Sequence, residues 1–359
     1  MTDRRRATWL LGGAIFALSL GVNMHVAMNV NFIHELLHGT SWQQGYLEAI
    51  RETCGILSFF VIMALVGRSE PKVAAVMLLL VGTGLAAYSR IATIPHLILC
   101  SLIWSFGFHV WVPISGSLAL ALARRGREGR LLGTLGSVGA AGVLMGLALV
   151  WALRRFAGFG MRELFLGGGA LTALGAIPLL FLPDVRERRA DVPRLTSFLA
   201  PKFRLYAAFE LLDGMRKQIF ILFATLALVQ EHGARVETIA ALMFANQIIM
   251  LGLAPLVGRW VDRVGSRTAL VAYFTGLIGV FILYTALRDV RVLYGVFMVD
   301  SALWSLRVGL STYAKGLTGA TERTRLLAMG VTMNHVGAVT LPLAGGALYA
   351  LYGYRLPFY

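Results

Sequence analysis

Long stretches without a charged residue constrain the fold of this chain more than any other feature. A helix needs about 20 mostly apolar residues to cross the hydrocarbon core of a membrane. The chain is 57% hydrophobic and only 14% charged, whereas soluble domains carry roughly a quarter charged residues. One water-soluble core could not bury so much apolar surface. We therefore predict an all-α polytopic membrane protein. The eight stretches without Asp, Glu, Lys or Arg are 7–34, 73–89, 91–123, 131–153, 164–183, 238–258, 268–287 and 326–354.

Three further segments are apolar but interrupted by charge, at about 43–66, 206–230 and 290–316, which brings the expected number of spans to eleven. Lys and Arg concentrate in cytoplasmic loops. With the N-terminus inside, 21 of the 33 Lys and Arg fall in cytoplasmic segments and 8 in outer ones. We expect a multi-pass protein of a bacterial inner membrane with a cytoplasmic N-terminus.

The longest polar segment, 184–205, follows the sixth span and is expected to be a cytoplasmic linker. It would separate an N-terminal half, 1–183, from a C-terminal half, 206–359. Three short matches between the halves occur in the same order, at offsets of 191 to 195 residues, as expected for a duplicated fold of two six-helix halves with pseudo-twofold symmetry. A mirrored second half would need a twelfth span after Arg355. We therefore expect that the chain is truncated, the alternative being that the natural protein has lost its last helix.

A family resemblance appears in the loop between the eighth and ninth spans, GRWVDRVGSRT at 258–268. It resembles the loop signature Gly-x-x-x-Asp-Arg-x-Gly-x-Arg of the major facilitator superfamily. The resemblance implies a secondary transporter, a loop that helps to latch one conformation, and glycines that permit close approach and a tight turn. A first copy after the second span is eroded to GRSEPK at 67–72. The matching residues are Gly258, Asp262, Arg263, Gly265 and Arg267.

Two other signatures of the family are missing. The fourth span lacks the arginine that the resemblance implies for proton coupling, and the fifth lacks the Gly-Pro element of drug–proton antiporters. Both absences argue against a typical multidrug antiporter. The glycines of the fifth span, from Gly133 to Gly146, instead predict a face for close helix packing.

Ionisable residues within the apolar segments are the best guide to a site, because such groups are costly in hydrocarbon and face the bundle interior or a wet cavity. Five acids and four bases lie in the second, seventh and tenth spans, so structural ion pairing is the alternative reading of each one. In the second and seventh spans they fall at helical spacings of three and four, which gather them on one face. They are Glu48, Arg51, Glu52, Glu210, Asp213, Arg216, Lys217, Asp300 and Arg307.

We assign these residues and their polar neighbours to two roles. Arginine suits bidentate recognition of a carboxylate or phosphate, and an acid or histidine suits proton coupling. The candidates for substrate binding are Arg51, His109, Arg216, Lys217, Asp300, Arg307 and Asn246. The candidates for proton coupling are Glu52, Glu210, Asp213, Asp300 and His335.

The leading hypothesis is a secondary active transporter of a small polar or anionic organic solute, coupled to protons and working by alternating access. The alternatives are a flippase for lipids or amphiphiles on the same fold and a sensor or assembly protein that has lost transport. No metal-spaced cluster, nucleophile elbow or nucleotide-binding loop indicates an enzyme or a cofactor. The expected partners are a small-molecule substrate, H⁺ and membrane lipids, with no nucleic acid, and the chain is expected to be a monomer.

Overall fold

The computed structural model describes residues 2–65, 67–124, 127–184, 201–317 and 320–359. These residues form helices and turns, with no strand among them, as predicted. The predicted linker 184–205 lies mostly outside the described residues.

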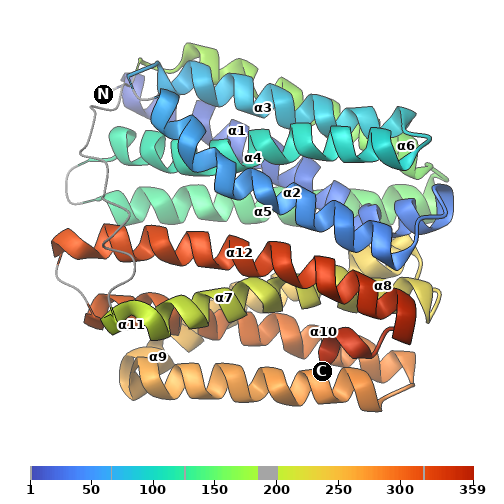
Figure 1. Cartoon of the computed structure of the whole chain (residues 1–359). Coiled ribbons are helices and arrows are strands. Elements are labelled where there is room, and N and C mark those ends of the chain that lie inside the picture. Colours follow the sequence, from blue (N-terminus) through green and yellow to red (C-terminus); the bar gives the residue numbers. More distant parts are fainter. Residues whose placement is uncertain (1, 66, 125–126, 185–200, 318–319) are drawn as a thin grey trace. The chain divides into compact units, whose positions relative to one another are not determined.

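Helices cover each of the eleven segments that the hydropathy pattern predicted (Figure 1). Some segments contain a break: a π-helical turn separates α7 from α8, and a 3-10 turn separates α10 from α11. Up to Phe181 the elements are α1 (Thr2–Asn31), η1 (Phe32–Leu36), α2 (Ser41–Leu65), α3 (Glu70–Ala87), η2 (Tyr88–Arg90), α4 (Ile94–Leu122), α5 (Glu128–Phe156), α6 (Met161–Leu174) and η3 (Ile177–Phe181). From Pro201 they are η5 (Pro201–Phe203), α7 (Arg204–Gln218), η6 (Ile219–Ala224), α8 (Thr225–Gln230), α9 (Val236–Ala286), α10 (Val290–Leu303), η7 (Trp304–Arg307), α11 (Val308–Leu317), α12 (Ala320–Tyr352) and η8 (Leu356–Phe358).

Seven of the described helices are long and apolar enough to cross a membrane. The charged helix α2 is not among them, although it has 25 residues. They are Arg4–Leu36, Glu70–Arg90, Ile94–Leu122, Arg130–Phe156, Met161–Phe181, Val236–Ala286 and Val290–Leu317.

The chain divides into two compact units, and the division departs from chain order at two helices. Residues 39–52, at the start of α2, group with the second unit, and residues 235–244, at the start of α9, group with the first. The first unit otherwise contains 1–38 and 53–190, and the second contains 191–234 and 245–359. The predicted half boundaries at 183 and 206 stay a prediction.

In the first unit, α1 and α5 pack closely through glycine. A Cβ added at Gly142 or Gly146 would meet the α1 backbone, at the carbonyl oxygens of Phe16 and Leu20 respectively. The predicted glycine face is therefore present in the second half of α5. Earlier in α5, at Gly133, no described atom lies within 4 Å of an added Cβ.

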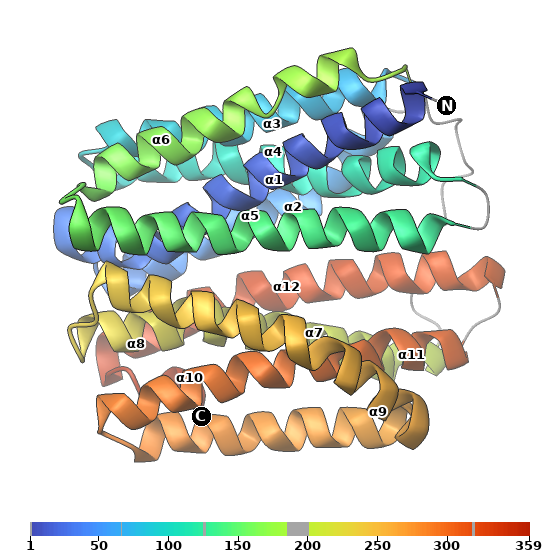
Figure 2. The same ribbon diagram turned by 180° about the vertical axis from the view of Figure 1, so that it is seen from behind.

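In the second unit, glycine brings α7 against α12, and a sharp bend divides α9. A Cβ on Gly214 would collide with the carbonyl oxygen of Asn334, and one on Gly337 with that of Leu211. Gly265 has φ +81° and ψ 164° within α9, a combination that is essentially restricted to glycine. Figure 2 shows the two arms of α9 folding back on each other at this bend.

Candidate functional site

The charged side chains that interrupt the apolar segments all belong to the second unit, where α7 contributes the largest group. Glu210, Asp213 and Lys217 follow one another at spacings of three and four residues, so they lie along one face of α7. Arg216 lies beside this stripe. Because Glu210, Asp213 and Arg216 are all buried, each needs a partner close by to offset the cost of leaving water.

Asp213 is the centre of the first group of contacts. Its carboxylate is fully buried and accepts hydrogen bonds from Tyr273 Oη at 2.7 Å, Arg307 Nε at 2.6 Å and Asn334 Nδ2 at 2.9 Å. These donors come from the second arm of α9, from η7 and from α12. The close approach of α7 and α12 at Gly214 is what brings Asn334 within reach.

Glu210 extends this group by one turn. Tyr206 Oη donates to Oε1 of Glu210 at 2.8 Å, and Arg307 Nη2 contacts Oε2 at 3.1 Å. Arg307 therefore bridges two acids of α7. Its side chain remains 35% exposed, whereas the side chains of Glu210 and Asp213 are 7% and 0% exposed. A guanidinium that is open to water but bound to two buried carboxylates is suited to exchanging partners.

Arg216 and Asp300 form a second, sealed pair between α7 and α10. Arg216 Nη2 donates to both the side chain and the carbonyl oxygen of Asp300, and the two side chains are 2% and 0% exposed. The guanidinium also lies over the rings of Trp304 and Phe220, at 4.7 and 5.4 Å from their centroids. Its Nε and Nη1, and Oδ2 of Asp300, have no hydrogen-bond partner among the described residues.

Glu52 is the centre of the third group, which joins α2, α7 and α12. Its Oε2 accepts from Lys217 Nζ at 2.9 Å and lies 3.1 Å from His335 Nδ1, while Oε1 lies 3.4 Å from Arg51 Nη2. Arg51 also pairs with Glu48 on its own helix. The side chains of Lys217 and His335 are 18% and 14% exposed, so this group too is partly open to solvent.

The acids and cations of α7 pair with residues of other elements. Glu210 and Asp213 pair with Arg307. The reason is that η7 carries Arg307 back to α7, while Arg216 and Lys217 reach acids on α10 and α2.

Two further predicted residues, His109 and Asn246, lie on α4 and on the first arm of α9. His109 lies in the first unit, on α4, with Nδ1 2.8 Å from the carbonyl oxygen of Ser105. Asn246 lies in the second unit on the first arm of α9, and its buried amide has no hydrogen-bond partner among the described residues.

Three aromatic residues of the network were not predicted. Tyr206 precedes Glu210 by four residues and Trp304 follows Asp300 by four, so helical spacing alone could have identified both. Tyr273 lies 60 residues from Asp213, and only the fold brings the two together.

The signature loop lies at the bend of α9. Gly265 makes the expected turn, and Asp262, Arg263 and Arg267 are exposed. Gly258 was expected to allow a close approach, but no described atom lies within 4 Å of a Cβ placed there. Asp262 belongs to the last turn of the first arm, because the helix continues to the bend.

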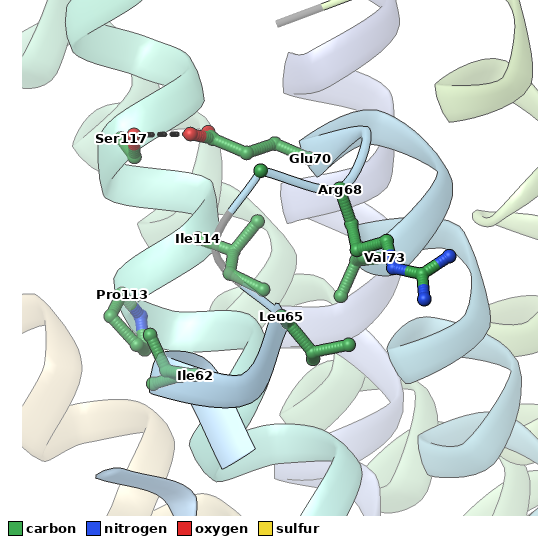
Figure 3. Close-up of a pocket in the computed structure, with 9 residues that line it drawn as sticks. Ile62, Leu65, Arg68, Glu70, Val73, Pro113, Ile114 and Ser117 are labelled. Carbon is green, nitrogen blue, oxygen red and sulfur yellow. Dashed lines mark hydrogen bonds between the residues drawn. The ribbon is translucent and has the colours of Figure 1, made fainter. Parts of the chain in front are cut away.

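The eroded copy of the loop adjoins a cavity of about 240 Å³ in the first unit. Gly67 turns the chain with φ +85°. Glu70, in the first turn of α3, is buried and accepts a hydrogen bond from Ser117 Oγ at 3.1 Å, while Arg68 points away from it (Figure 3). The wall of this cavity is mainly apolar and includes Ile62 and Ile114 beside Arg68 and Glu70.

Comparisons with known proteins agree with this architecture. Residues 206–359 match the family model described as Major Facilitator Superfamily. A curated relative, the "Multi-drug resistance efflux pump PmrA homolog" of Lactococcus lactis subsp. lactis (strain IL1403), is 25% identical over 273 residues. This match covers 69% of the chain and 64% of the relative, so the chain spans less than two thirds of that relative's length.

Solved structures of transporters share the fold over nearly the whole chain. A point mutant of the nucleoside transporter NupG superposes with a TM-score of 0.84 at 16% identity, covering 98% of this chain and 95% of that one. A bacterial homolog of the human lysosomal transporter Spinster, in an inward-facing and unoccupied conformation, gives 0.78 at 13% identity, covering 98% and 83%. These proteins are transporters and not enzymes. The chain therefore shares the fold of these proteins, and its residues 206–359 match the family model of the major facilitator superfamily.

Proposed function

We propose that the chain is a secondary active transporter that moves a small polar or anionic organic solute by alternating access and couples this movement to protons. The observation that carries the proposal is the state of two cations, Arg307 and Lys217. Each is bound to buried carboxylates, yet its own side chain remains partly exposed. A solute can therefore reach these cations without first opening a sealed core.

The proposed coupling is a competition between the solute and a carboxylate for the same cation. An anionic or strongly polar group that binds Arg307 displaces Asp213 or Glu210 from it. A carboxylate left buried without its counter-charge is destabilised, so it takes up a proton. When the solute leaves, Arg307 returns and the proton is released. Glu52, with Lys217 and His335, is the second position at which this exchange is proposed.

The structure favours a narrower set of substrate-binding residues than the sequence did. We assign Arg216 and Asp300 to a structural pair, since both are sealed and held by Trp304 and Phe220. Arg307 and Lys217 remain the proposed substrate-binding cations, while Glu210, Asp213, Glu52 and His335 remain proposed for the proton. The proposal also retains a monomer in a bacterial inner membrane with a cytoplasmic N-terminus.

Transport by the purified chain in proteoliposomes tests this proposal. Uridine is a suitable first probe, because the nucleoside transporter NupG shares the fold. An imposed pH gradient should drive accumulation of a transported solute, and adding that solute should cause proton movement that internal pyranine reports. Solute movement that is unaffected by the pH gradient, with no pyranine response, would refute proton coupling.

A second candidate is efflux of an amphiphilic drug, favoured by the curated relative that is named a multi-drug resistance efflux pump. Ethidium in the same vesicles distinguishes the two. Proton-driven ethidium movement that uridine does not inhibit would favour this second candidate. A fluorescent phospholipid in the same vesicles tests the flippase alternative.

A further inference from the structure

A cavity with a strongly basic lining lies at one end of the first unit. It has a volume of about 510 Å³ and is formed by the first turns of α1, the end of α4 and the start of α5. Figure 2 shows the first turns of α1 and α5 at the same end of this unit. The charged residues that line it are Arg4, Arg5, Arg124, Arg127 and Arg130.

The lining is suited to an anion with several oxygen atoms. All five arginines are exposed. Guanidinium groups bind phosphate through paired hydrogen bonds. The N-terminus of α5, a 29-residue helix that begins at Glu128, adds its positive dipole end beside Arg127.

The cavity also lies where candidate membrane spans begin and end. One such span starts at Arg4, another ends at Leu122 and a third starts at Arg130, so we place the arginines at the depth of lipid headgroups. Large apolar side chains within one or two helical turns are exposed, including Trp9 at 71% and Leu120 at 51%. Tryptophan is enriched at membrane–water interfaces.

We propose that this cavity binds the headgroup of an anionic phospholipid. The arginines hold the lipid phosphate, while the exposed apolar side chains lie beside its acyl chains. A soluble phosphate could meet the same arginines but would gain nothing from the apolar surface, so we assign the site to a lipid. This inference does not depend on the transported solute or on proton coupling.

Native mass spectrometry of the purified chain, titrated with phosphatidylglycerol or phosphatidylcholine, tests the proposal. The variant R124Q/R127Q/R130Q removes three positive charges from the cavity. The matched control, R259Q/R263Q/R267Q, removes three exposed arginines around the α9 bend. Because each arginine near an anionic surface contributes to lipid affinity, the cavity variant should bind phosphatidylglycerol at least about tenfold more weakly than the control. Equal binding by the two variants would overturn the proposal.

A second variant guards against a folding defect at the start of α5. R4Q/R5Q changes only the exposed start of α1 and should also weaken phosphatidylglycerol binding relative to phosphatidylcholine. If R124Q/R127Q/R130Q folds poorly, R4Q/R5Q decides the test. Unchanged phosphatidylglycerol binding by R4Q/R5Q would then overturn the proposal. Inorganic phosphate is the third arm. If phosphate at low millimolar concentration competes fully with phosphatidylglycerol, the site belongs to a soluble anion and the lipid assignment is wrong.

Discussion

The interiors of the two units are built by different chemistry. In the first, the imidazole of His25 lies among aromatic rings, with centroids 4.7 Å from Tyr88, 4.8 Å from Trp104 and 5.6 Å from Phe165. In the second, Asp213 lies fully buried among a tyrosine, an arginine and an asparagine that all donate to it. The aromatic rings contribute mainly through packing, whereas a buried carboxylate depends on every donor around it.

We therefore regard the first unit as structural support and the second unit as the place of the proposed transport chemistry. Contacts between rings have no second state in which a charge is exchanged. The charged residues of the second unit can exchange partners, because Arg307 already binds two acids and its side chain is partly exposed. The comparison teaches that solute and proton chemistry should respond to substitutions in the second unit far more than in the first.

The largest expected effect on stability comes from breaking the sealed pair. Arg216→Met leaves Asp300 charged and buried, which should lower the free energy of unfolding by about 3–5 kcal/mol. The double variant Arg216→Met/Asp300→Leu should recover most of that loss, since an apolar pair of similar size carries no unpaired charge. Thermal unfolding in detergent measures both. A double variant no more stable than the single one would contradict a structural role.

The next effect is on transport. Asp213→Asn removes the negative charge that pairs with Arg307. Proton-driven accumulation of the solute should fall by roughly tenfold or more, which corresponds to a loss of about 1.4 kcal/mol of interaction free energy. The matched control is Asp262→Asn, which makes the same change on an exposed residue of the α9 bend. It should alter the rate of cycling but leave accumulation dependent on the pH gradient. Equal loss of proton dependence in both variants would argue against a special role for Asp213.

Substitutions in the two loops sharpen the comparison between units. Gly265→Ala should cost about 1–3 kcal/mol because of its backbone conformation. Gly67→Ala should cost about 1–2 kcal/mol, although its loop has lost most of the signature. Gly258→Ala should instead be neutral or stabilising by up to about 1 kcal/mol, because it lies within a helix with open space around it. Unfolding temperatures that rank these three differently would contradict the assigned turns.

The smallest effect is expected in the first unit. Tyr88→Phe removes a hydroxyl that contacts Ser101 and accepts a hydrogen bond from Trp104 Nε1 at 3.4 Å. The ring and its packing remain, so the loss should be about 1 kcal/mol of stability with transport retained. Transport assays in proteoliposomes check this. Abolished transport at normal stability would place part of the mechanism in the first unit.

The sequence predicted the helical segments well because each apolar segment must cover its own backbone polar groups in a membrane. It also identified the charged residues of α2, α7 and α10, since such groups are costly and rare there. It did not predict their partners. Those depend on the 3-10 turn that redirects Arg307, and on the close approach at Gly214 that brings Asn334 to Asp213. Long-range packing of this kind has no local signal.

The most direct test of the central claim is a comparison of two transport modes in one set of proteoliposomes. The claim is that the ionic network around Asp213 couples solute movement to protons. With a solute that the wild-type chain transports, Asp213→Asn should retain exchange of labelled for unlabelled solute across the membrane while losing accumulation driven by a pH gradient. If Asp213→Asn accumulates the solute in response to the pH gradient as fully as the wild type does, the claim is wrong.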